Sequence, residues 1–189
     1  MALFNRSWFY LFIHLILIFW MFSSAHADQR DQRLDELFDQ LASPDDAVKR
    51  QEAENGIWKI WFESGSTEVD ELMATALEAA DRGKLKAAEQ LYNSVIDLAP
   101  DFAEAWNRRA TIRYYQSDFE GSLEDIRQTL ILEPRHYGAV WGLGMILGLR
   151  HEFEKSIAAF EQLLRIKPYA SGIQDRIELL KLEMSKNSV

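Results

Sequence analysis

The sequence predicts an all-α protein built from stacked helix pairs, and three observations carry this prediction. Pro100, Pro134 and Pro168 lie 34 residues apart. Small and large apolar residues recur at fixed distances from each proline. Between the prolines, apolar residues follow the three- and four-residue spacing of one helix face. A period of this length holds two helices, and a single pair cannot bury its apolar face alone, so the stack is the folding unit.

Residues 1–27 differ in composition from the rest of the chain. Arg6 precedes an apolar run over residues 8–22, and the small residues at 25–27 come just before a charged stretch. This pattern predicts a secretory signal peptide cleaved between Ala27 and Asp28, and therefore export. A retained membrane anchor is the alternative, but 15 residues rise only about 22 Å as a helix, short of a hydrocarbon core of about 30 Å.

Composition narrows the classes of function. The chain has no cysteine, which excludes disulfides and thiolate metal sites. Its net charge is −9, and the predicted mature chain is also acidic, so electrostatics give no reason to expect binding to nucleic acid. We expect no nucleic-acid partner.

Residues 28–67 are predicted to form an N-terminal helical cap at the first repeat, one end of the stack. Leu34, Leu37, Phe38 and Leu41 make one short amphipathic helix. A second helix is predicted to open with Ser43 as its N-cap and Pro44 at its first position. That helix closes on Trp58 and Trp61, which we interpret as core residues because large aromatic side chains usually supply buried area.

The three repeats are 69–102, 103–136 and 137–170, and the matching residues extend over 69–168. The recurring residues stand at four fixed distances before the prolines. Large residues lie 15 positions before (Leu85, Phe119 and Phe153) and 8 positions before (Tyr92, Ile126 and Phe160). Small residues lie 12 positions before (Ala88, Ser122 and Ser156) and 24 positions before (Ala76, Ala110 and Gly144). Polar turns at 81–84, 116–119 and 150–153 divide each repeat into two helices, and the proline ends the second one. The tail, 171–189, is predicted to hold a C-terminal capping helix that starts near Ser171, with Ile173, Ile177, Leu180 and Met184 on its apolar stripe.

The 34-residue period, Trp106 at the fourth place of its repeat and the closing proline resemble the tetratricopeptide repeat family. The flanks "DFAEAWNRRAT" and "LEPRHYGAVWGLG" resemble small exported bacterial members of it. The resemblance implies a right-handed α-solenoid of three helix pairs and, with the signal peptide, a location in the bacterial periplasm. It also implies a concave face that holds a peptide or protein. The two-carboxylate clamp of chaperone-binding members is not implied, because its set of Lys, Asn and Arg residues is absent.

By this resemblance, the concave face takes defined positions from the first helix of each repeat. In the second repeat these are Glu104, Asn107, Arg108, Thr111, Tyr114 and Tyr115, and in the third they are Gly138, Trp141, Gly142, Met145, Gly148 and Leu149. From these we take a partner-binding set of Asn107, Arg108, Thr111, Tyr114, Trp141, Gly142, Met145 and Gly148.

The stretch "YGAVWGLGMILGLR" contains four glycines, each of which costs a helix roughly 1 kcal/mol relative to alanine. We predict a helix nevertheless, with Gly144 as the small residue of its pair. Gly138, Gly142 and Gly148 fall on the inner face. They leave room either for a bound partner or for a neighbouring helix such as 171–186.

Two arginines lie at normally apolar positions, Arg109 and Arg113. They could form an anion site, but we favour internal ion pairs with Glu124 or Asp125, since an unpaired buried arginine is costly.

No motif indicates catalysis, so we expect neither an enzyme nor a cofactor. The cluster "HEFE" at 151–154 is interpreted as a solvated turn rather than a metal site. The predicted function is a non-catalytic adaptor for a protein or peptide partner. The alternative is a scaffold or homo-oligomer with a self-filled groove, docking through aromatic residues near Trp61 or anchored to a membrane by an uncleaved N-terminus.

Overall fold

The computed structural model describes residues 31–44 and 46–186, and the secondary structure within these ranges is helical throughout. The helices are α2 (Gln32–Leu41), α3 (Ala47–Trp61), α4 (Thr67–Asp81), α5 (Leu85–Leu98), α6 (Ala103–Tyr115), α7 (Phe119–Leu132), α8 (Tyr137–Leu149), α9 (Phe153–Ile166) and α10 (Ile173–Lys186). The predicted signal peptide and its cleavage site at Ala27–Asp28 lie outside the described residues.

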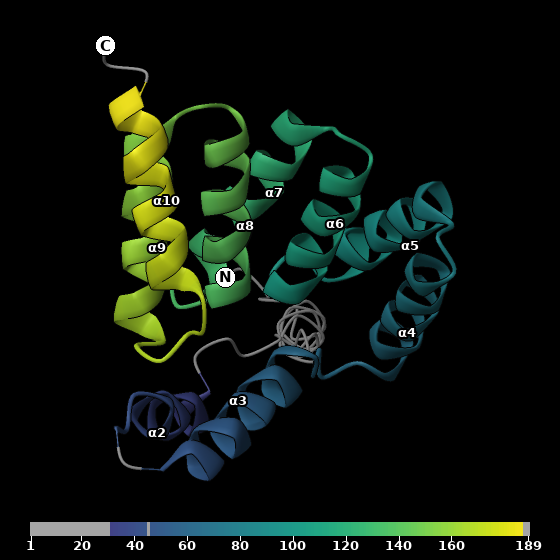
Figure 1. Ribbon diagram of the computed structural model, residues 1–189. Coiled ribbons are helices and arrows are strands. Elements are labelled where there is room, and N and C mark those ends of the chain that lie inside the picture. Colours follow the sequence, from purple (N-terminus) through teal and green to yellow (C-terminus); the bar gives the residue numbers. More distant parts are fainter. Residues whose placement is uncertain (1–30, 45, 187–189) are drawn as a thin grey trace, which may run out of the picture.

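Helices α4 to α9 form the three pairs that the proline spacing predicts (Figure 1). The second helix of each pair ends two residues before its proline, at Leu98, Leu132 and Ile166. The turn inside each pair contains one residue with positive φ: Gly83 at 70°, Ser117 at 64° and His151 at 59°. These residues are also 34 positions apart, so the period governs the backbone conformation as well as side-chain size.

Small residues let the two helices of a pair approach closely. Ser122 Oγ donates to the Ala110 carbonyl at 2.7 Å, and Ser156 Oγ donates to the Gly144 carbonyl at 2.6 Å. A Cβ at Gly144 would lie 2.8 Å from two ring carbons of the fully buried Phe160. Gly144 is therefore the small residue that the third pair requires, and close packing on the Phe160 ring offsets its cost in helix propensity.

The second pair is joined by the internal ion pairs that we favoured. Both oxygens of the fully buried Asp125 accept from Arg109, at 2.7 and 2.9 Å, and one also accepts from Arg113 at 3.0 Å. Arg109 is further bound by Asn93, at 2.7 Å, and Arg113 by Glu89, at 3.0 Å. These partners occupy both guanidinium groups, which leaves no reason to assign them to an anion site.

Helix α10 covers the last repeat. Ile173, Ile177 and Leu180 are buried in the same cluster as Phe160 of α9. The helix begins at Ile173 rather than at Ser171, because Gly172 takes a φ of 74° that ends the preceding turn.

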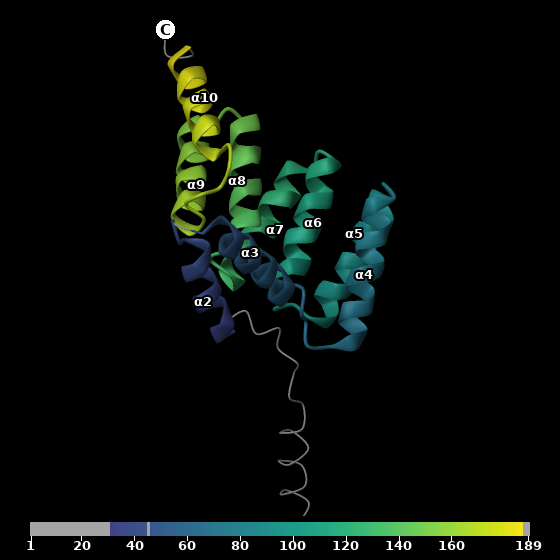
Figure 2. The same ribbon diagram turned by 60° about the horizontal axis from the view of Figure 1, so that its bottom comes forward.

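The N-terminal hairpin corrects our expectation of a cap at the first repeat. Helices α2 and α3 lie below the repeats, next to the lower ends of α8 and α9 (Figures 1 and 2). Trp61 is buried in one cluster with Tyr137 of α8 and Leu163 of α9, whereas the first repeat has a separate core. Lys167 pairs with Glu54 across this contact at 2.5 Å. The hairpin therefore packs against the third repeat.

The physical reason lies in the outer face of α4, which is polar and needs no cover. Its exposed residues include Glu68, Glu71, Thr75 and Glu78. The start of α3 differs as well: Asp46, not Ser43, is its N-cap and accepts from the backbone N–H groups of residues 48 and 49, both at 3.0 Å.

Candidate functional site

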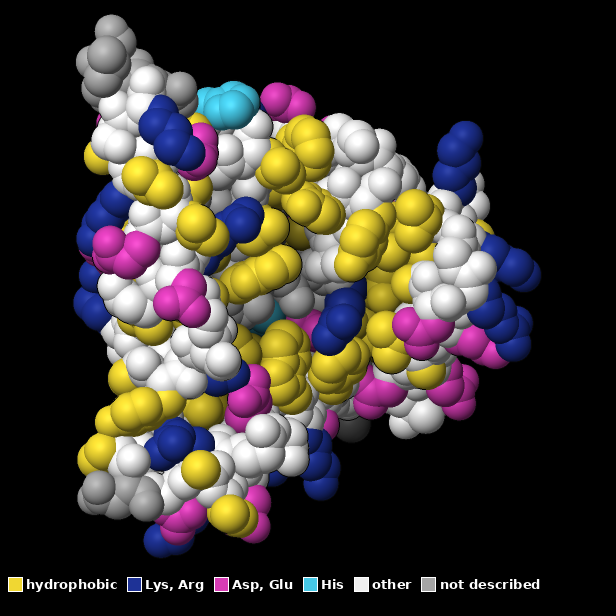
Figure 3. Space-filling model, viewed as in Figure 1, with side chains coloured by type: hydrophobic (Ala, Val, Ile, Leu, Met, Phe, Trp, Pro, Cys, Tyr) yellow, Lys and Arg dark blue, Asp and Glu magenta, His cyan; other side chains and the backbone are white. Residues whose placement is uncertain are grey.

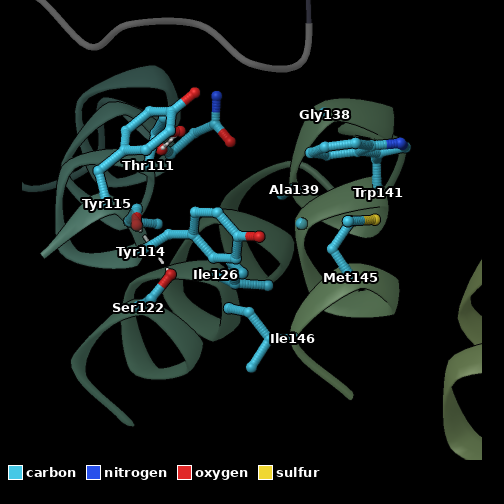
Figure 4. Close-up of a pocket in the computed structure, with 13 residues that line it drawn as sticks. Thr111, Tyr114, Tyr115, Ser122, Ile126, Gly138, Ala139, Trp141, Met145 and Ile146 are labelled. Carbon is cyan, nitrogen blue, oxygen red and sulfur yellow. Dashed lines mark hydrogen bonds between the residues drawn. The ribbon is translucent and has the colours of Figure 1, made fainter. Parts of the chain in front are cut away.

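The repeats surround a hollow on the face shown in Figure 3, where apolar side chains gather and Lys or Arg side chains stand at the edges. A pocket of about 90 Å³ opens between α6 and α8, with α7 behind it (Figure 4). Among the predicted partner-binding residues, the structure brings the following six together in its lining: Asn107, Thr111, Tyr114, Trp141, Gly142 and Met145.

Aromatic side chains form two opposite walls of the pocket. Tyr114 and Tyr115 stand on the α6 side, with ring centroids 5.8 Å apart in an edge-to-face arrangement. Trp141 stands on the α8 side, above Met145 (Figure 4). Tyr115 is 66% exposed and Trp141 is 47% exposed, so both present large apolar area to a ligand.

Each inner-face glycine of α8 has a different environment. A Cβ at Gly142 would meet only the tip of Ile126, at 3.3 Å, and this glycine widens the pocket. A Cβ at Gly138 would meet the ring of Trp58, at 3.1 Å. A Cβ at Gly148 would meet Ser156, at 3.2 Å, and Leu180 of α10. Gly148, one of the predicted site residues, therefore serves packing against α9 and α10 and lies outside the pocket lining.

Arg108, the other predicted residue outside the pocket lining, faces the N-terminal hairpin. Its Nε lies 2.5 Å from Glu104, and its guanidinium lies over the rings of Phe62 and Trp58, at 4.8 and 5.6 Å from their centroids. This guanidinium is already paired and stacked within the chain.

A buried polar cluster lies beneath the hollow. Glu104, expected on the inner surface, is fully buried and accepts from Asn107 at 2.9 Å, so this donor of Asn107 is committed internally. His136 is also fully buried and is stacked on Trp61, with 4.1 Å between ring centroids. Trp61 is buried too, so it offers no surface for docking.

The tautomer of His136 follows from its partners. Its Nδ1 accepts the backbone N–H of Ala139 at 3.2 Å, which makes His136 the N-cap of α8. The proton therefore sits on Nε2 and is donated to Glu104 at 2.9 Å. Burial alone raises the pKa of Glu104, but the His136 hydrogen bond and the charge of Arg108 outweigh it, so the pKa lies below its ordinary value. The sequence signal for this role was the place of His136 directly before a helix.

Sequence reasoning missed one residue that contacts the pocket lining. Arg176 of α10 is half-buried, and its Nη2 lies 3.5 Å from the sulfur of Met145, a lining residue. Its position between the buried Ile173 and Ile177 on α10 was the signal that could have placed it near the inner face.

Two further findings concern the part of the chain that the structure describes. There, no cluster of three or more metal-ligating side chains occurs. In the same part, every helix is too short or too polar to span a bilayer.

Comparison with known proteins establishes the family. A tetratricopeptide repeat model matches residues 107–171. A TPR repeat-containing protein of Rhizobium etli is 35% identical over 156 residues, which are 82% of this chain and 76% of that protein. Tetratricopeptide repeat protein 36 of Mus musculus is 32% identical over 111 residues, 50% of this chain and 60% of its own. The chain belongs to the tetratricopeptide repeat family.

Solved structures confirm the all-α repeat fold. The TPR domain of Sgt2 from Aspergillus fumigatus matches with a TM-score of 0.60 and 18% identity, covering 65% of this chain and 83% of that one. The first TPR of RPAP3, bound to an HSP90 peptide, matches with a TM-score of 0.61 and 16% identity, covering 64% of this chain and 95% of that one. The Yersinia enterocolitica secretion chaperone SycD, in complex with a peptide of the translocator YopD, matches with a TM-score of 0.58 and 11% identity. The match covers 63% of this chain and 96% of that one. At these identities the likeness shows the fold alone.

Proposed function

We propose that this protein is a non-catalytic adaptor that binds a protein or peptide partner in the pocket between α6 and α8. One observation carries the proposal: the pocket combines an apolar interior with the exposed aromatic rings of Tyr115 and Trp141. Aromatic side chains at the edge of a concave site are the residue type that most often anchors a protein partner. RPAP3 and SycD, which share the fold, have each been solved with a bound peptide, and this supports a peptide or protein as the class of ligand.

The predicted setting of this adaptor is the bacterial periplasm. Its support is the composition of residues 1–27, with a short basic start, an apolar run and small residues before Asp28. The mass of the protein purified from its own cells tests this part. A chain that begins at Asp28 supports export with cleavage, and one that begins at Met1 contradicts it.

Filling the pocket tests the binding site. Leucine at Gly142 would project into the pocket, where its Cβ meets only the flexible tip of Ile126. We expect Gly142→Leu to reduce partner capture from cell-envelope extracts at least about tenfold, with the thermal unfolding midpoint within about 2 °C of the unmodified chain. The matched control is Ala158→Leu, which adds a leucine at an exposed position of α9.

Partner capture and the unfolding midpoint together distinguish a binding role of Gly142 from a packing role. Loss of capture with an unchanged midpoint, and with capture retained by Ala158→Leu, supports the pocket. Capture that survives Gly142→Leu contradicts the proposed site. A large drop in the midpoint would show that Gly142 is required for internal packing instead.

A further inference from the structure

Arg176 is an anomaly in an acidic chain. The sequence has 30 acidic residues against 21 Lys and Arg, so carboxylates are in excess. Arg109 and Arg113, which are likewise half-buried, each pair with Asp125. No carboxylate of residues 31–44 or 46–186 lies within 4.0 Å of the Arg176 guanidinium.

The hydrogen bonds of Arg176 are also incomplete. Its Nε atom is buried and has no hydrogen-bond partner in the described ranges. Among the described residues, its Nη2 donates to the sulfur of Met145, which is a weak acceptor. Buried donors are almost always paired in folded proteins, and a cation without a carboxylate is costly to keep partly buried. Within the described residues, Arg176 is therefore a positive charge beside the pocket wall with no carboxylate paired to it.

Geometry links this charge to the pocket. Met145 forms part of the α8 wall (Figure 4), and its sulfur lies 3.5 Å from Nη2 of Arg176. A ligand whose apolar side chain fills the pocket therefore brings its neighbouring residues past Arg176. Arg108 cannot serve the same purpose as readily, because Glu104 already neutralises it.

We propose that the ligand of this pocket is a peptide segment with an aspartate or glutamate close to the apolar side chain that enters the pocket, and that Arg176 pairs with that carboxylate. The inference rests on the proposed function and adds the chemistry of the partner. It also gives α10 a second role, in which the helix that covers the last repeat supplies the residue that sets ligand specificity.

Peptide display tests this specificity. A library of random dodecapeptides, embedded in a carrier so that no peptide has a free C-terminus, is selected on the full chain, on Arg176→Gln and on Arg165→Gln. Arg165 is an exposed arginine of α9 and provides the matched loss of charge away from the pocket. The strongest peptide is then synthesised with amidated ends, with Glu or Gln at the acidic position, and its affinity is measured by fluorescence anisotropy.

The expected result is enrichment of Asp or Glu at a fixed spacing from an aromatic or aliphatic residue. The Glu peptide should bind the unmodified chain at least about tenfold more tightly than the Gln peptide, because a charge-assisted hydrogen bond is lost. The preference should disappear in Arg176→Gln, persist in Arg165→Gln and weaken with added salt. Arg176→Lys should keep part of it, since the charge remains.

Other results would overturn the inference. The selected peptides could bind the full chain, fail to bind Gly142→Leu and yet show no preference for Asp or Glu. That result would refute the role of Arg176 while leaving the proposed function intact. An Arg176-dependent gain found only with a free C-terminus would replace the side-chain carboxylate by a chain end. A library from which the full chain selects nothing would count against both proposals.

Discussion

The four glycines of α8 allow a matched comparison of two alanine substitutions in one helix. Gly144→Ala places a methyl group 2.8 Å from two carbons of the buried Phe160 ring and 3.0 Å from a third. Gly142→Ala places the same group 3.3 Å from the tip of Ile126, beside an open pocket. Both changes gain about 1 kcal/mol in helix propensity. The difference between the variants therefore reports the packing.

The magnitudes follow from these distances. At Gly144 the ring must shift inside a close-packed core, and such overpacking costs typically about 1–3 kcal/mol. We expect Gly144→Ala to be destabilised by about 1 kcal/mol net, and Gly142→Ala to be stabilised by about 0.5 kcal/mol. The corresponding difference in unfolding midpoint is about 3–6 °C, measured by circular dichroism and checked by urea titration. Equal midpoints, or a more stable Gly144→Ala, would refute the explanation of these glycines.

Three further predictions test buried interactions of the folded chain. Asp125→Ala leaves two arginines without their shared carboxylate and should cost about 3 kcal/mol in urea unfolding, whereas Glu124→Ala, at an exposed ion pair, should cost less than about 1 kcal/mol. Trp61→Ala should cost about 3–5 kcal/mol and expose α2 and α3 to limited proteolysis; intact resistance would contradict the hairpin contact. The pKa of Glu104 is lower in the folded chain than its ordinary value of 4.5, so the ionised carboxylate stabilises the fold. This contribution is full above pH 4.5 and is lost as the pH falls through the pKa of Glu104 in the folded chain. The urea midpoint should therefore fall as the pH drops below the ordinary pKa of 4.5, and less steeply in Glu104→Gln; parallel slopes would rule out this role.

The repeats could be predicted from sequence because their information is local and periodic. The prolines end the second helices, and the residue sizes around Gly144 and Ser156 mark where the two helices of a pair meet. The position of the hairpin carried no such signal. Its contact between Trp61 and Tyr137 joins residues 76 positions apart, and no spacing in the sequence relates them.

The candidate site could be predicted from the sequence only in part. The resemblance to the tetratricopeptide repeat places Tyr114 and Trp141 on the inner faces of α6 and α8, and the structure brings both to one pocket. It could not show that Arg108 is turned toward the hairpin, since that depends on where Trp58 lies. Arg176 could not be assigned from the sequence for a related reason. Its role depends on a contact between α10 and Met145 of α8, which lies 31 positions earlier in the chain.

Photo-crosslinking in the native cell tests the central claim most directly. A photoreactive residue is placed at Trp141, which is 47% exposed at the pocket, and a control at Lys155, whose side chain is 72% exposed on α9. We predict a discrete adduct with another polypeptide at position 141, none at position 155, and loss of the adduct when Gly142→Leu is added. An adduct from position 141 only to residues 173–186 of the same chain, or equal adducts from both positions, would contradict the account of the pocket as a binding site.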